Sequence, residues 1–109
     1  MDCSFQSLNF GNDGYVVRCR QCGQYQVAFI TTVLTLSERE FRSFCAQVRE
    51  TLRRYAGDMG DPGKTVVLRT PLQGVCICVL PAEANSLLGL LEEAETESET
   101  QDLIKLFNP

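Results

Sequence analysis

The chain has 109 residues but no histidine and no tryptophan, and its six cysteines are the main source of metal or redox chemistry. Without imidazole it cannot form a Ser-His or Cys-His nucleophile pair, a histidine general base, or a zinc site that needs histidine. Any metal site must therefore use thiolates, with or without a carboxylate. No pattern in the sequence identifies a substrate, so we assign no catalytic residue and favour a non-catalytic role.

Long apolar runs are also missing. No segment reaches the length of a membrane span, and residues 1–4 show neither the basic nor the apolar region of a signal peptide. We therefore expect a cytoplasmic protein without a membrane association. In that reducing compartment cysteines are buried apolar side chains, metal ligands or redox thiols rather than disulfides. The length and the 44% apolar content predict one domain over residues 1–109.

The most informative motif is Cys19-Arg20-Gln21-Cys22-Gly23. Two thiols three positions apart suit a tight turn that presents both sulfurs, and the following glycine tolerates a positive φ. We interpret Cys19 and Cys22 as zinc ligands. The alternatives are two incidental thiols in a turn and a redox-active dithiol, whose pKa Arg18 and Arg20 could lower.

A closed zinc site needs four ligands. Cys3 is the natural third ligand, because the N-terminal segment can fold back over the motif. Cys45 is expected in the core, because it falls on the apolar stripe of a helix. Cys76 and Cys78 share one face of a strand and are also expected in the core. The fourth ligand stays open: one of these three cysteines, water or a carboxylate could supply it, or no stable site exists.

The hydrophobic pattern predicts an α+β fold of order ββ-α-ββ-α-α, with an antiparallel sheet of about four strands and helices packed on one face. Residues 2–13 are expected to be an irregular lead-in, and residue 57 a helix stop. The glycine-rich segment 57–64 lacks the spacing of a phosphate loop and is expected to be a connection. The predicted elements are a hairpin over 15–35 with the CxxC motif at its tip, a helix over 37–56, a hairpin over 65–80, and helices over 82–96 and 99–107.

Several positions within these elements have a predicted role. Ser37 with Glu40, and Ser98 with Gln101, have the spacing of helix capping boxes. The final helix is expected to expose Leu103, Ile104 and Phe107 on one side. The expected buried stripes of the first two helices are Phe41, Phe44, Cys45, Val48, Leu52 and Tyr55, then Ala84, Leu87, Leu88, Leu91 and Ala94.

Charge is segregated along the chain, whose net formal charge is −4. Residues 15–54 hold seven arginines against three glutamates, whereas residues 81–109 hold seven acidic side chains against Lys105. We expect the two helical faces to attract each other or to be solvated. A basic patch for an acidic partner is the alternative.

The run from Gly14 to Phe29, with its CxxC followed by Tyr-Gln-Val-Ala-Phe, resembles a family of small uncharacterised proteins from Bacteroidetes-type bacteria, a domain of unknown function. The resemblance covers residues 3–95 and implies no established activity. Members of that family often carry a histidine where this chain has Gln24, which cannot replace imidazole as a ligand. Further segments that carry the resemblance are Thr31-Thr32-Val33, Phe41-x-x-Phe44-Cys45 and Leu90-Leu91-Glu92-Glu93-Ala94. Cys3, Cys19, Cys22 and Cys45 look similar to family positions, and Cys76 and Cys78 do not.

Three hypotheses follow. The first is a small domain that holds zinc through Cys3, Cys19 and Cys22 and contacts another protein or a second copy through a sheet edge or its last helix. The second is a thiol-disulfide redox protein that uses Cys19 and Cys22. The third and weakest is a nucleic-acid-contacting domain that uses Arg18, Arg20 and the arginine face of the first helix, with Tyr25 available for stacking. The net negative charge argues against it.

Overall fold

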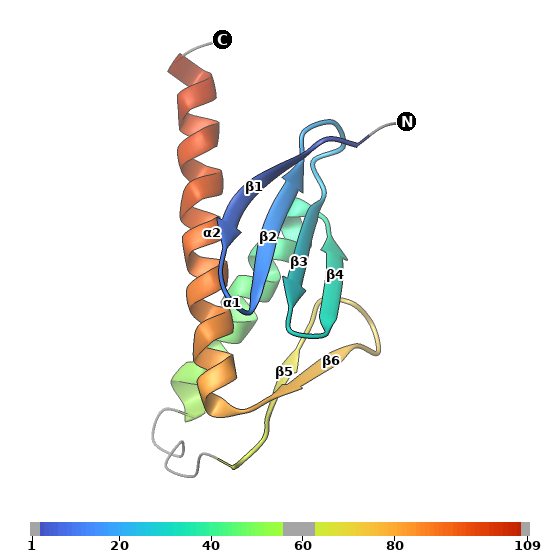
Figure 1. Ribbon diagram of the computed structural model, residues 1–109, viewed down its shortest axis with the longest axis vertical. Coiled ribbons are helices and arrows are strands. Elements are labelled where there is room, and N and C mark those ends of the chain that lie inside the picture. Colours follow the sequence, from blue (N-terminus) through green and yellow to red (C-terminus); the bar gives the residue numbers. More distant parts are fainter. Residues whose placement is uncertain (1–2, 56–62, 108–109) are drawn as a thin grey trace.

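The computed structural model describes residues 3–55 and 63–107. Within these residues, two helices and two antiparallel sheets make an α+β fold, so the predicted fold class is confirmed (Figure 1). Residue 57 and most of the glycine-rich connection lie outside the described residues. The elements in order are β1 (Phe5–Phe10), β2 (Gly14–Cys19), β3 (Tyr25–Phe29), β4 (Thr32–Leu36), α1 (Glu38–Tyr55), β5 (Val66–Arg69), β6 (Cys76–Val79) and α2 (Pro81–Phe107).

All four strands of the larger sheet come from the first third of the chain, in the order β1-β2-β3-β4. The prediction of an irregular lead-in was wrong, because β1 pairs with β2 along its whole length. A bulge between Ser7 and Asn9 interrupts its register, and Leu8 at the bulge is the only buried side chain of this strand. That interruption removes the regular alternation by which an amphipathic strand is recognised.

The predicted hairpin over 15–35 contains three strands instead of two, because the chain turns at Ile30 and Thr31 between β3 and β4. Ile30 has φ of 53°, which a β-branched residue seldom adopts. Tight hairpin turns usually carry glycine, asparagine or aspartate. The sequence therefore offered no conventional turn signal here.

The second hairpin forms a separate sheet of β5 and β6 instead of joining the larger one. The expectation that Cys76 and Cys78 lie in the core was wrong. Both cysteines are exposed, whereas Ile77 and Val79 on the opposite face are buried. An apolar strand in a two-stranded sheet buries only the face that meets the core.

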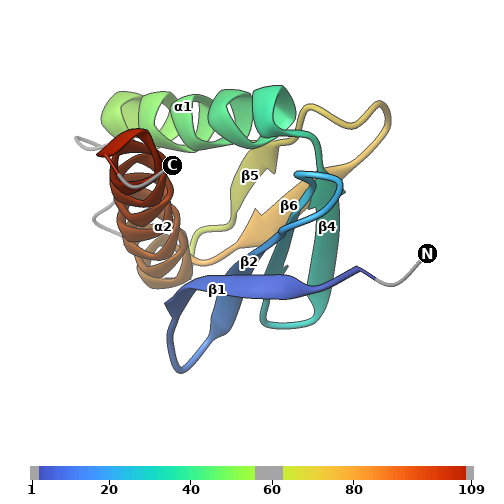
Figure 2. The ribbon, with the colours of Figure 1, turned by 90° about the horizontal axis from the view of Figure 1, so that it is seen from above.

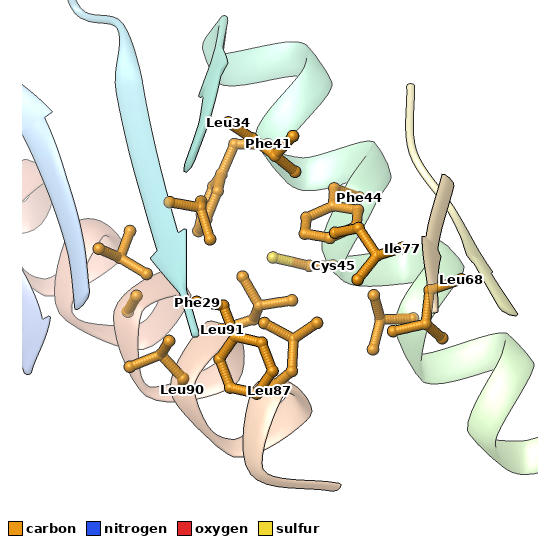
Figure 3. Close-up of a cluster of buried hydrophobic side chains, with 14 of the residues drawn as sticks. Phe29, Leu34, Phe41, Phe44, Cys45, Leu68, Ile77, Leu87, Leu90 and Leu91 are labelled. Carbon is orange, nitrogen blue, oxygen red and sulfur yellow. The ribbon is translucent and has the colours of Figure 1, made fainter. Parts of the chain in front are cut away.

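The core lies between the inner face of the larger sheet, the two helices and the small sheet (Figure 2). Side chains from all of these layers meet there, and Cys45 is fully buried among them as predicted (Figure 3). The rings of Tyr25 and Phe41 stack with centroids 4.3 Å apart and join sheet to helix. The predicted buried stripes are confirmed except at Tyr55, which is exposed, and Leu88, which is only partly buried.

Helix α1 begins as its sequence predicts. The Ser37 hydroxyl accepts a hydrogen bond from the Glu40 backbone N–H at 3.1 Å, and the Glu40 carboxylate accepts one from the Ser37 N–H at 2.8 Å. This reciprocal pair satisfies two backbone donors that the first helical turn leaves without partners.

The C-terminal part of the chain is one helix of 27 residues, so the prediction of two helices was wrong. Ser98, expected to cap a helix, lies inside α2 and is buried. Its hydroxyl contacts the Tyr25 hydroxyl at 2.7 Å and accepts a hydrogen bond from the Arg18 guanidinium at 2.9 Å. A buried serine with polar partners from the sheet fits a continuous helix, and its cap-like spacing with Gln101 is coincidental.

Arg18 connects the sheet to α2 from a buried position. Besides Ser98 it donates to Asp102 at 3.2 Å and to Gln101 at 3.0 Å. A buried guanidinium is costly unless its donors are paired, and these contacts pair it. The network therefore sets how α2 lies against β2.

The two helices also attract each other through charge. Arg42 pairs with Glu99 at 3.5 Å, and Arg49 pairs with Glu92 at 3.3 Å and with Glu95 at 3.2 Å. These exposed pairs contribute little individually. They join two arginines of α1 to three glutamates of α2, which is the attraction between helical faces that the sequence led us to expect.

We expect Ser98→Ala to lower the free energy of unfolding by about 1–3 kcal/mol, because it leaves two buried polar partners incompletely bonded. Urea denaturation measures the loss. Ser86→Ala, at an exposed position of the same helix, is the matched control and should change stability by less than about 0.5 kcal/mol. Equal stability of the two variants would show that the Arg18–Tyr25–Ser98 network contributes nothing.

Candidate metal centre

Three cysteine sulfurs converge where β2 ends. Those of Cys3, Cys19 and Cys22 all lie within 4.8 Å of one another, and the Cys3 and Cys22 sulfurs are 4.0 Å apart. Cys19 is buried, whereas Cys3 and Cys22 are exposed. The structure thus brings together the three residues that the sequence singled out as ligands.

The CxxC motif forms the turn between β2 and β3, at the hairpin tip where the sequence placed it (Figure 1). The Cys22 backbone N–H donates a hydrogen bond to the Cys19 sulfur at 3.4 Å, and the Gly23 N–H donates to the Cys19 carbonyl at 3.1 Å. Gly23 adopts φ of +76°, the left-handed conformation that favours glycine. This backbone geometry presents the Cys19 sulfur to N–H donors, as thiolate-binding turns require.

Ser4 holds Cys3 beside this turn. Its backbone N–H donates to the Gln21 side-chain oxygen at 2.7 Å, and its carbonyl accepts from the Arg20 N–H at 2.8 Å. Sequence reasoning missed both Ser4 and Gln21, because neither residue type has a recognised role in such sites. The second bond extends the pairing of β1 with β2, and together the two bonds hold the third thiol beside the turn.

Hydrogen bonds within the cluster shift the pKa values of two of its thiols. The pKa of Cys19 is lowered to about 6, chiefly because the Cys22 backbone N–H donates to its sulfur. The pKa of Cys3 is raised to about 11, chiefly through its side-chain hydrogen bond with Cys19 and then that with Cys22. At neutral pH the Cys19 sulfur is therefore a thiolate and Cys3 keeps its proton.

Arg18 does not serve the thiols as the sequence suggested. Its guanidinium is bonded to Tyr25, Ser98, Gln101 and Asp102 in the buried network. The lowered pKa of Cys19 comes instead from the backbone and side-chain donors of the turn and from Cys3. Alternation along β2 explains this, because Arg18 shares the inner face of the strand with Val16 whereas Cys19 follows on the other face.

The remaining cysteines are not among the converging thiols. Cys45 is buried in the core, where burial raises its pKa to about 12. Cys76 and Cys78 are exposed on the second sheet. Within residues 3–55 and 63–107, no further cysteine, aspartate or glutamate joins the three converging sulfurs.

The three sulfurs fit a soft divalent ion. Zinc–sulfur bonds of about 2.3 Å in a tetrahedron place two sulfurs about 3.8 Å apart. The 4.0 Å between Cys3 and Cys22 is close to that value, and no pair exceeds 4.8 Å. Small side-chain rotations suffice to close the cluster on an ion.

A family model described as "Family of unknown function (DUF6686)" matches residues 1–108. No curated protein and no solved structure matches the chain. Neither helix in the described part of the chain is long and apolar enough to cross a membrane.

We expect the metal-free protein to gain one thiolate near pH 6, because the N–H donors around Cys19 favour its charged form. The thiolate absorption band, followed from about pH 5 to about pH 8, measures it. Cys19→Ser should lose this step, and Cys78→Ser, which removes an exposed thiol outside the cluster, should keep it. No thiolate absorption below about pH 8 in the wild type would contradict the expected pKa.

Proposed function

We propose a metal-binding role for this chain, which belongs to the family of unknown function DUF6686. In this proposal Cys3, Cys19 and Cys22 hold one zinc ion. The ion fastens the N-terminal edge strand to the tip of the β2–β3 hairpin. The role is structural rather than catalytic.

The observation that carries the proposal is the convergence of three sulfurs from two separate segments within 4.8 Å. Cys3 is 16 positions from Cys19 in the chain, so local sequence alone does not bring them together. Thiolates are soft ligands that suit zinc, and one of the three is already ionised at neutral pH. The site requires reduced thiols, which a cytoplasmic location would maintain.

A redox role for Cys19 and Cys22 is the second candidate, and the lowered pKa of Cys19 is compatible with it. Two observations favour the metal instead. The thiol whose pKa is lowered, Cys19, is buried, and the motif lies between two strands instead of at a helix N-terminus. Three converging thiols also exceed what a dithiol couple needs.

The source and signature of the family remain part of this proposal. We take the CxxC followed by Tyr25–Phe29 as its characteristic segment, and a Bacteroidetes-type bacterium as the source, on the resemblance alone. Family members that lack Cys19 and Cys22 would argue against this segment as the signature of the family.

Purified without added metal, the protein should contain about one zinc per chain by elemental analysis. The Cys19→Ser, Cys22→Ser double variant should contain none, because two of three ligands are lost. Cys3→Ser, at an exposed position, covers the case in which the double variant fails to fold. The Cys76→Ser, Cys78→Ser variant is the control and should keep its zinc.

Zinc should also stabilise the folded chain, by about 4 kcal/mol when free zinc exceeds its dissociation constant 1,000-fold. Thermal melts with and without a chelator measure this contribution. A wild-type protein free of zinc whose melting is unchanged by added zinc would reject the metal site.

The exposed apolar end of α2 is the proposed protein-interaction surface. Beyond Asp102 the helix carries Leu103, Ile104, Leu106 and Phe107, each more than half exposed. It projects past the end of the larger sheet (Figure 1). The simplest occupant is a second copy of the chain.

Light scattering tests this surface. We expect a dimer for the wild type and a monomer for Leu103→Glu, because a buried, unpaired carboxylate disfavours association. Val67→Glu places the same change at an exposed apolar position on β5 and should leave the dimer intact. A monomeric wild-type chain would exclude the second copy as the occupant.

A further inference from the structure

We infer that the chain binds inorganic phosphate in a cavity between the inner face of the larger sheet and the two helices. The cavity has a volume of about 170 Å³, and residues of β1, β2, β3, α1 and α2 line it. A buried arginine in its wall donates to the anion, two exposed cations attract the anion, and two carboxylates accept its proton. The site is separate from the proposed metal centre, since neither Cys3 nor Cys22 lines the cavity.

Arg18 is the buried donor of this cavity. Only 9% of the residue is exposed. Its Nη1 donates to Tyr25, Ser98 and Asp102. Its Nη2 donates to Gln101, and its Nε has no hydrogen-bond partner in the part of the chain that the structure describes.

The Arg18 Nε is nevertheless open to a ligand. Among the described side chains that are not exposed, Gln47 Oε1 is the one fully enclosed nitrogen or oxygen without a hydrogen-bond partner. Arg18 Nε therefore meets open space, and Arg18 lines the cavity. An unused guanidinium N–H beside a cavity suits an oxyanion, because arginine–phosphate contacts are among the strong hydrogen bonds of proteins.

Two further cations line the cavity from different elements. Arg20 directly follows β2, and Lys105 lies near the end of α2. Both are exposed, and within residues 3–55 and 63–107 neither makes an ion pair. Their uncompensated charge attracts an anion to the cavity and raises its local concentration there.

Two carboxylates in the lining select phosphate among small anions. Asp102 pairs with Arg18 through Oδ1 at 3.2 Å, and Glu38 pairs with Arg42 through Oε1 at 3.2 Å. The second oxygen of each carboxylate keeps its capacity to accept a hydrogen bond. At neutral pH inorganic phosphate retains an O–H that can donate to such an oxygen, whereas sulfate has none and is only repelled.

The size of the cavity restricts the ligand further. Pockets for drug-sized molecules have volumes of about 300–1,000 Å³. The cavity of about 170 Å³ is smaller than that range. It suits a small tetrahedral anion better than a nucleotide or another large phosphate ester.

Equilibrium dialysis of the full chain against radiolabelled inorganic phosphate tests the site. We expect saturation at a single phosphate per chain. Sulfate should displace the label only at a concentration about tenfold higher than unlabelled phosphate needs, as the loss of a charged hydrogen bond allows. The Asp102→Asn, Glu38→Gln variant should bind the two anions alike. Equal competition by sulfate in the wild type would overturn the assignment to phosphate.

The Arg20→Gln, Lys105→Gln variant should bind phosphate about tenfold more weakly, because two exposed ion pairs are lost. The Lys64→Gln, Arg69→Gln variant removes the same kinds of charge from exposed positions that do not line the cavity. It is the matched control and should bind as the wild type does. Arg18→Gln should abolish binding, and the Arg20, Lys105 variant decides the question if Arg18→Gln fails to fold.

Cys3→Ser separates this site from the metal centre, because it removes a proposed metal ligand and leaves the lining of the cavity unchanged. It should bind phosphate as the wild type does. Loss of binding in Cys3→Ser would place the anion on the metal and overturn the inference. A wild-type chain that binds no phosphate, or equal binding by the wild type and the Arg20→Gln, Lys105→Gln variant, would also overturn it and leave the metal site intact.

Discussion

The antiparallel pairing of β1 with β2 is the constraint on which both the core and the cysteine cluster depend. Its register sets Phe5 opposite Cys19, and the hydrogen bond from the Arg20 N–H to the Ser4 carbonyl continues it past the end of the strand. Cys3 therefore arrives beside the CxxC turn as part of a sheet edge. The same pairing turns Leu8 into the core. Without this register, only Cys19 and Cys22 would lie at the tip of the β2–β3 hairpin, and the edge of β2 would be uncovered.

A second coupling runs from the same strand to α2. Arg18 precedes Cys19 in β2 but points to the inner face, where Ser98 and Asp102 bind it. Neighbouring residues of one strand thus serve two sites, one on each side of the sheet, as strand alternation requires. A change that moves the end of β2 acts on the cysteine cluster and on the position of α2 together.

The cysteines show which structural features a local sequence pattern can predict. Helical periodicity placed Cys45 in the core, and the CxxC spacing with its glycine predicted the turn, because both properties depend on near neighbours in the chain. The same reasoning was wrong for Cys76 and Cys78, which it placed in the core. An apolar strand looks alike in a central position and in a two-stranded sheet, and only the packing of the hairpin decides which face is covered. Ser98 is a similar case, because a cap-like spacing carries no information on a distant arginine.

The sequence by itself determined the α+β class, the capped start of α1, the apolar stripes and the thiol-only chemistry that the lack of histidine imposes. These properties follow from composition and from contacts within a few residues. Tertiary structure alone decided that β1 exists, that α2 is continuous, and that Arg18 is buried. It also decided the approach of Cys3 to Cys19 and Cys22, which sequence reasoning could only suggest. Each of these depends on strand pairing or packing between segments far apart in the chain. The spacing of neighbouring residues does not predict such contacts.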